Sequence, residues 1–141
     1  VGDIDLGLVI KNIGPVKKDM KRMKNVKKFL VSGEKLFRVL LQDNTQVDLK
    51  ISPPEEWGSF LQHFTGSKEH NIKLRQYALA EKNFSLSEHG IKVLDPETKK
   101  PNQTLKFADE KEFYHALDLN WIPPEERIGK NEIKRYKQDK H

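Results

Sequence analysis

Strand-like patterns dominate the first fifty residues of the chain. Residues 4–10 are mostly Ile, Leu and Val and end at a turn over 12–15, which predicts a strand. Apolar residues then recur at helical spacing over 16–28, which predicts a helix. Three β-like runs separated by short turns follow, at 28–31, 36–41 and 46–51. We therefore expect a sheet with a helix on one face.

Helical and strand-like patterns alternate in the remainder. The Pro53-Pro54 pair precedes a predicted helix over 55–64, and Ser67 is placed to cap a second helix that runs to about Lys82. A hairpin around a His-Gly pair, a polar loop and a short helix are expected next, over 84–94, 95–103 and 109–117. The chain as a whole is predicted to have an α+β fold.

Composition narrows the range of partners and compartments. The formal net charge of +5 and the pI of about 9.3 fit a polyanionic partner, although a lysine run is also typical of a solvated face. The absence of cysteine excludes disulfides and thiolate metal sites. A signal peptide and an apolar run of about 18 residues are both missing. We expect an intracellular protein of the cytoplasm or nucleoid with no membrane partner.

Three acidic residues are candidates for a metal site. Asp3 and Asp5 are two positions apart on a predicted strand, so both side chains project from the same face. Asp48 lies on another predicted strand, where Val47 and Leu49 point into the core and Asp48 points away from it. Grouped carboxylates favour a divalent cation, although Asp-x-Asp is also typical of a solvated strand edge. The five histidines have no metal-ligand spacing, and we expect packing or surface roles for them.

A longer motif follows the predicted sheet. Residues 64–75 read Phe-Thr-Gly-Ser-Lys-Glu-His-Asn-Ile-Lys-Leu-Arg. This run closely resembles the signature that joins the palm of family X DNA polymerases to their nucleotide-selecting subdomain, particularly the bacterial and archaeal version. Four further segments resemble that family in the same order, at 2–5, 47–49, 87–90 and 121–127. The resemblance covers about residues 2–133.

The resemblance implies a division of the chain. Residues 1–62 would be the C-terminal part of the palm, with a nucleotidyltransferase-type mixed or antiparallel sheet and a helix. Residues 63–128 would be the nucleotide-selecting thumb or fingers subdomain, a small α+β unit. Residues 129–141 carry few apolar side chains and are expected to be a solvated tail.

The resemblance also implies roles for individual residues. Catalysis and the binding of Mg²⁺, or Mn²⁺ in its place, would fall to Asp3, Asp5 and Asp48. The incoming nucleotide would contact Gly2, Phe64, Thr65, Gly66 and Asn71. DNA would contact Arg75, Lys21, Lys24, Lys28 and Lys35. Asn71 and Arg75 are four positions apart, which places them on one helix face.

Several positions depart from the family pattern. His63 stands where many members have Tyr, which leaves sugar selection open. Gln46 stands where some relatives have an Arg that orients the third acid, and Lys35 is displaced by one position from a primer-contacting lysine. The family's Gly-Ser…Arg element, which grips the triphosphate, would precede Val1.

These observations predict a monomeric, metal-dependent enzyme. We expect template-directed transfer of nucleotides from deoxynucleoside triphosphates to gapped or primer-template DNA, in gap-filling repair. The main alternative is a non-catalytic DNA-binding chain that lacks the upstream triphosphate-binding element. A nucleotidyltransferase acting on a small molecule or an RNA end would share the Asp pair but not the Thr-Gly-Ser helix.

Overall fold

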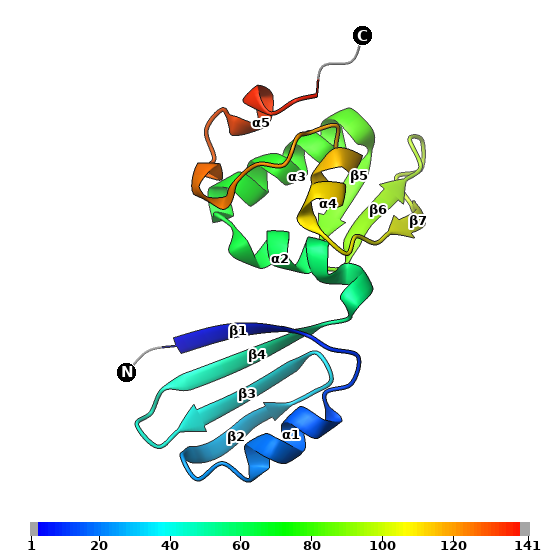
Figure 1. The fold of residues 1–141 in the computed structure, drawn as a ribbon. Coiled ribbons are helices and arrows are strands. Elements are labelled where there is room, and N and C mark those ends of the chain that lie inside the picture. Colours follow the sequence, from blue (N-terminus) through cyan, green and yellow to red (C-terminus); the bar gives the residue numbers. More distant parts are fainter. Residues whose placement is uncertain (1–2, 139–141) are drawn as a thin grey trace. The chain divides into compact units, whose positions relative to one another are not determined.

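The computed structural model describes residues 3–138, which fall into two compact units, Val1–Pro54 and Glu55–His141. Each unit has its own sheet and its own hydrophobic core (Figure 1). The α+β class predicted from the sequence is confirmed. Among the described residues, the structure contains no helix with the length and apolar character needed to cross a bilayer.

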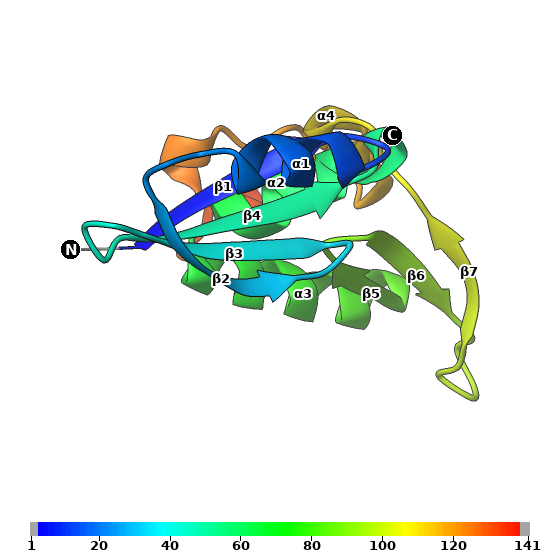
Figure 2. The ribbon, with the colours of Figure 1, turned by 90° about the horizontal axis from the view of Figure 1, so that it is seen from below.

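The first unit is a four-stranded sheet with one helix. Its elements are β1 (Asp3–Val9), α1 (Gly14–Lys21), β2 (Val26–Ser32), β3 (Leu36–Leu41) and β4 (Gln46–Ser52). The strand order is β1-β4-β3-β2. The β1–β4 pair is parallel, whereas β2–β3 and β3–β4 are antiparallel. Helix α1 covers one face of this mixed sheet (Figure 2).

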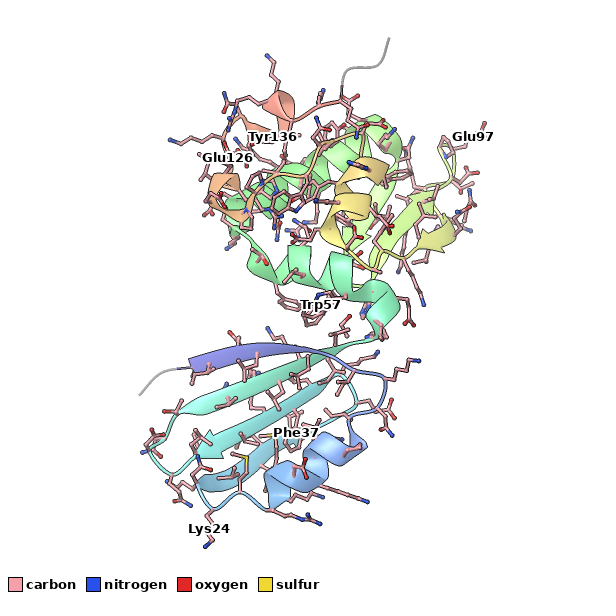
Figure 3. The ribbon with its side chains drawn as sticks, in the orientation of Figure 1. Lys24, Phe37, Trp57, Glu97, Glu126 and Tyr136 are labelled. Carbon is pink, nitrogen blue, oxygen red and sulfur yellow. The ribbon has the colours of Figure 1, made fainter. Side chains whose placement is uncertain are left out.

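Alternation along β3 and β4 builds the core of the first unit. Phe37 and Val39 on β3, with Val47 and Leu49 on β4, are all buried. Ile13, at the start of α1, joins the same cluster, and Val16 and Met20 of the helix pack against it. Figure 3 labels Phe37 between the sheet and the helix. The residues between these positions therefore face the side of the sheet opposite α1.

Helix α1 is shorter than the sequence pattern predicts. It ends at Lys21, whereas the apolar spacing suggested a helix to residue 28. Val26 instead begins β2 and pairs with Leu41 of β3. A β-branched residue fits a half-buried strand well, and the cross-strand pairing outweighs the helical spacing.

The second unit begins with a turn of 3₁₀ helix at Pro54–Glu56. Its other elements are α2 (Trp57–Thr65), α3 (Lys68–Lys82), β5 (Phe84–Ser87), β6 (Gly90–Leu94), β7 (Pro101–Leu105), α4 (Glu110–Ala116), a second 3₁₀ turn (Pro124–Glu126) and α5 (Glu132–Arg135). The three strands form an antiparallel sheet in chain order. Leu74 and Ala78 of α3 pack in the core with Ile91, Phe113 and Tyr114.

Helix α2 belongs to the second unit because it packs closely on the start of α4. The amide of Gly58 donates to the carbonyl of Phe107 over 2.8 Å. A Cβ at position 58 would lie 2.2 Å from the carbonyl oxygen of Asp109, so only glycine allows this approach. The division between the units accordingly falls between Pro54 and Glu55, whereas the family resemblance suggested a boundary after residue 62.

The structure adds detail to two other expectations for the second unit. The polar loop expected over 95–103 contains the start of β7, an edge strand that opens with Pro101, where a missing N–H is tolerated. The expected solvated tail contains α5, and Glu132 within it is fully buried. Polar contacts of Glu132 and Gln138 hold this segment in place, and Ile133 and Tyr136 pack against the core of the second unit.

Candidate functional site

The polar face of the first sheet aligns two of the three predicted acids. The parallel register sets Asp5 opposite Asp48 and Asp3 opposite Gln46. Asp3 and Asp5 are exposed on β1, which is the edge strand beside β4. Val47 and Leu49 are buried in the core, as the alternation predicted, so Asp48 lies on the face away from α1.

Asp48 is held by two polar side chains, Arg38 and Gln46. Arg38 of β3, its cross-strand partner, donates from Nε to Oδ1 over 2.8 Å and from Nη2 to Oδ2 over 3.0 Å. Gln46 donates from Nε2 to Oδ1 over 3.2 Å. The hydrogen bond from Arg38 is the largest cause that holds the pKa of Asp48 below its usual value.

Arg38 was missed in the sequence, although a signal for it exists. The Asp43-Asn44 turn fixes the register of the β3–β4 hairpin, and that register sets Arg38 opposite Asp48. The pKa of Arg38 is raised mainly by its hydrogen bond to Asp48, with smaller contributions from the charges of Asp3 and Asp5. The guanidinium thus contacts Asp48 directly, whereas Asp3 and Asp5 affect it only through their charge.

The three acidic side chains suit a divalent cation in chemistry, but they are not grouped around one position. Carboxylate oxygens are the ligands that Mg²⁺ prefers, and three carboxylates project from one face of two neighbouring strands. Within residues 3–138, however, no three acidic or histidine side chains are grouped closely enough to hold a metal ion as they stand. Gly2, predicted to contact the triphosphate, lies outside the described residues.

In the second unit, the Thr-Gly-Ser turn connects α2 to α3. Gly66 ends α2 with φ +75°, a conformation that favours glycine, and the Gly66–Ser67 peptide bond is cis. Ser67 caps α3 as predicted, because its hydroxyl accepts from the amide of His70 over 3.2 Å. The turn is thus tied to the first turn of the following helix.

A cavity of about 400 Å³ lies at this turn. Its lining brings together five residues predicted to contact nucleotide or DNA: Phe64, Thr65, Gly66, Asn71 and Arg75. His63, Ser67 and Lys68 complete the lining. Residues on both sides of the α2–α3 turn therefore line one cavity, whose volume suits a small ligand.

The Asn71 side chain is oriented from α2. Its Nδ2 donates to the carbonyl of His63 over 2.9 Å, and its Oδ1 accepts from Nε2 of Gln62 over 2.7 Å. Gln62, which sequence reasoning did not single out, is buried and also donates to the Tyr114 hydroxyl over 3.4 Å. These bonds fix the rotamer of Asn71 at the cavity wall.

His70 of the same motif has a packing role, as expected, but a more polar one. It is fully buried, its Nδ1 lies 2.7 Å from Oε2 of Glu132, and its Nε2 lies 3.0 Å from the Tyr114 hydroxyl. Burial lowers the pKa of His70, which favours the neutral ring. Glu132 also accepts from the amides of Gly129 and Lys130, each over 2.8 Å. The motif helix is thereby anchored to the C-terminal segment.

The predicted DNA-contacting lysines all lie in the first unit and are exposed. Lys21 ends α1, Lys24 follows it and Lys28 lies on β2. Figure 3 shows Lys24 pointing away from the sheet. Lys35, in the turn before β3, instead lines a separate cavity of about 420 Å³ at the start of α1. The four lysines are thus not all brought to one place.

Comparison with known proteins decides the family. A family model described as DNA polymerase beta thumb matches residues 60–128, all within the second unit. The "DNA polymerase/3'-5' exonuclease PolX" of Bacillus subtilis (strain 168) is 34% identical over 138 residues, which is 96% of this chain. The chain belongs to the family X DNA polymerases. The family X resemblance of its motifs is thereby confirmed.

Other family X relatives match a shorter part. The "DNA-directed DNA/RNA polymerase mu" of Homo sapiens is 35% identical over 82 residues, or 58% of this chain. The "DNA nucleotidylexotransferase" of Xenopus laevis is 34% identical over the same length. The chain spans only 23% of the Bacillus subtilis protein, 16% of the human protein and 15% of the Xenopus protein.

Proposed function

We propose that this chain takes part in template-directed DNA nucleotidyl transfer and serves gap-filling repair. The alignment of Asp5 with Asp48, with Asp3 on the same face, carries the proposal. Membership of family X supports it, because the matched relatives are named as DNA polymerases and a nucleotidylexotransferase.

In this proposal the first unit provides the metal ligands. Asp3 and Asp5 would hold a divalent cation together with the triphosphate, and Asp48 would hold the cation nearest the primer end. When bound, Mg²⁺ or Mn²⁺ supplies Lewis-acid activation of the primer hydroxyl and neutralises charge on the triphosphate. Gln46 and Arg38 restrict the rotamers of Asp48, so this carboxylate is positioned before any substrate arrives.

The second unit selects the nucleotide in this proposal. Gly66 has no side chain, so a sugar can approach the backbone between Thr65 and Ser67 closely. Asn71, fixed by Gln62 and His63, would offer its remaining amide hydrogen to the edge of a base. Arg75 carries a positive charge one helical turn further along, on the same cavity wall.

A gapped-primer assay tests the proposal. With Mg²⁺ and the complementary deoxynucleoside triphosphate, the chain should extend the primer by one nucleotide, and Asp48→Ala should abolish the product. Asp19→Ala removes an exposed acid from α1 of the same unit and should leave extension unchanged. Extension by Asp48→Ala at the rate of the unaltered chain would refute the proposed role of Asp48.

The alternative of DNA binding without turnover is favoured by one observation. The acids are not grouped into a ready metal site within residues 3–138. In that case the chain would bind gapped duplex, measured by fluorescence anisotropy, yet neither it nor Asp48→Ala would extend the primer.

A further inference from the structure

The C-terminal segment and α3 enclose a second cavity in the second unit. It has a volume of about 420 Å³, and its lining comes from α3 and from residues 130–137. Helix α5, within that segment, lies beside α3 (Figure 1). The Lys73 ammonium donates to the carbonyl of Lys130 over 3.2 Å, which ties the two walls of the cavity together.

This cavity lies on the side of α3 away from the cavity at the Thr-Gly-Ser turn. Lys73 and Tyr77 line the former, whereas Asn71 and Arg75 line the latter. Positions two apart on an α-helix are separated by about 200° around its axis, so the two pairs project in nearly opposite directions. The residues proposed to select the nucleotide therefore take no part in this second cavity.

Apolar side chains form the inner wall of the cavity. Tyr77 and Ile133 line it and also pack against the core of the second unit. The Tyr77 hydroxyl donates to the carbonyl of Leu117 over 2.7 Å, and burial is the main cause that raises the pKa of Tyr77. Because the hydroxyl is neutral and already engaged, the ring is the part of Tyr77 that is left to contact a ligand.

The rim of the cavity is strongly positive. Its four lysines are all exposed, namely Lys73, Lys130, Lys134 and Lys137. Within residues 3–138, no acidic side chain lines the cavity and no ion pair engages any of the four. The Lys137 ammonium lies 5.3 Å from the centroid of the Tyr77 ring. Like charges gathered around one cavity repel one another, and a bound polyanion offsets that repulsion.

We propose that this cavity and its rim bind single-stranded DNA, with one base against Tyr77 and Ile133 and the flanking phosphates on the lysines. A single strand can follow a basic groove while its unpaired bases contact aromatic and apolar side chains. The bases of a duplex are stacked inside it, so a duplex could contact the rim but not the inner wall. The combination of an apolar wall with a lysine rim therefore favours a single strand.

The proposed site is separate from the acids of the first unit and from the cavity at the Thr-Gly-Ser turn. It goes beyond the proposed function, and only the choice of DNA as the strand rests on that function. Binding can accordingly be measured without metal or nucleotide.

The first test measures affinity by fluorescence anisotropy, with the whole chain and a labelled thymidine oligomer of about ten nucleotides. Replacing Lys130 and Lys134 together by Gln should weaken binding roughly tenfold, and the slope of log affinity against log salt should fall by about 1.4. Replacing Lys92 and Lys100 by Gln removes the same charge from exposed positions of the same unit and should change both quantities little. Equal losses in the two variants would overturn the proposed site.

An abasic oligomer of the same length and charge tests whether a base enters the cavity. It should bind the unaltered chain roughly tenfold more weakly than the thymidine oligomer, because the contact between base and ring is lost. If the two oligomers bind equally tightly, the lysines contact phosphates alone and the role of the apolar wall is refuted.

A third measurement locates the strand without any substitution. The methyl resonances of Ile133 should shift when the thymidine oligomer is added to the unaltered chain, and a blunt duplex should shift them less. Unchanged Ile133 resonances at saturation would overturn the inference. An oligoglutamate peptide of equal charge that displaces the oligomer at equal concentration would also overturn it, since the surface would then fit an acidic protein segment.

Asp48→Ala separates this inference from the proposed function. The variant should bind the thymidine oligomer as tightly as the unaltered chain, because Asp48 lies in the other unit. A failure of primer extension thus refutes the proposed function alone. A thymidine oligomer that binds without shifting Ile133 refutes the single-strand site alone.

Discussion

At the scale of single residues, the buried pair of His70 and Glu132 links stability to pH. Burial alone would raise the pKa of Glu132, but hydrogen bonds from His70 and the amides of Gly129 and Lys130 lower it from 4.5 to about 2. A lowered carboxyl pKa stabilises the folded state above pH 4.5, and this contribution is lost as the pH falls from 4.5 to about 2. His70 adds a further loss of stability below pH 6.5, because its ring is protonated more readily in the unfolded chain than in the buried site.

Replacing Glu132 by Gln tests this coupling. The free energy of unfolding of the variant should be about 3 kcal/mol lower at pH 7, because a buried and hydrogen-bonded charge is removed. The difference from the unaltered chain should shrink as the pH falls from 4.5 toward 2. Urea unfolding followed by tryptophan fluorescence reports on this unit alone, since both tryptophans, Trp57 and Trp121, belong to it.

Glu97→Gln is the matched control, because Glu97 is exposed on the loop between β6 and β7. It should leave the free energy of unfolding nearly constant across the same range of pH. If the difference in free energy of unfolding between Glu132→Gln and the unaltered chain stays constant down to about pH 2, the lowered pKa of Glu132 is contradicted.

Residues such as these mark the limit of prediction from sequence. Glu132 belongs to a polar segment without apolar periodicity, and its partners are 62 positions away or in a tight turn. Asp48 could be placed because Val47 and Leu49 fixed its face. Side chains recognised by local alternation or by a motif were predicted, and those defined by a distant polar partner were not.

At the scale of elements, Gly58 determines how closely α2 approaches the start of α4. Gly58→Ala would set a Cβ against the Asp109 carbonyl, so the helix must shift. We expect the free energy of unfolding to fall by about 2 kcal/mol, measured by urea unfolding. Ser59→Ala is the matched control, because the buried Ser59 hydroxyl has no partner among the described residues. It should be neutral or slightly stabilising, and equal losses in both variants would contradict the close approach.

In the first unit, the exposed residues Lys21 at the end of α1, Lys24 after it and Lys28 on β2 are predicted to contact DNA. Reversing the charge of Lys21, Lys24 and Lys28 to Glu should weaken binding to gapped duplex. The slope of log affinity against log salt should fall by up to about 3, because fewer counterions are released. Fluorescence anisotropy over a series of salt concentrations gives both quantities.

A second triple variant separates this effect from net charge. Lys92, Lys100 and Lys111 are exposed residues of the second unit, and their reversal changes the charge of the chain equally. The slope of log affinity against log salt for this variant should stay close to that of the unaltered chain. If both triple variants lose the same slope, the lysines after α1 and on β2 are no more than part of a solvated face.

At the scale of the whole molecule, most of the architecture could be predicted and the division between units could not. Hairpins and capped helices follow from alternation, turn residues and caps, whereas a mixed sheet was expected only from the family resemblance. The boundary at Pro54 depends on Gly58 packing against a loop about fifty residues later, and β7 depends on pairing with β6 despite a weak pattern. Both are contacts between distant segments, which local periodicity does not encode.

The parallel pairing of β1 has a consequence for the order of folding. Strands β2, β3 and β4 are joined by short turns, whereas β1 reaches β4 only across the whole of α1, β2 and β3. Ile4 and Leu6 remain 46% exposed, so few apolar contacts hold β1 in place. Loop closure makes such a strand late to dock. Amides of β1 should therefore exchange with deuterium sooner than those of β4. We therefore expect the Asp5 carboxylate to approach that of Asp48 only after the rest of the unit has folded and can offset the repulsion between the two charges.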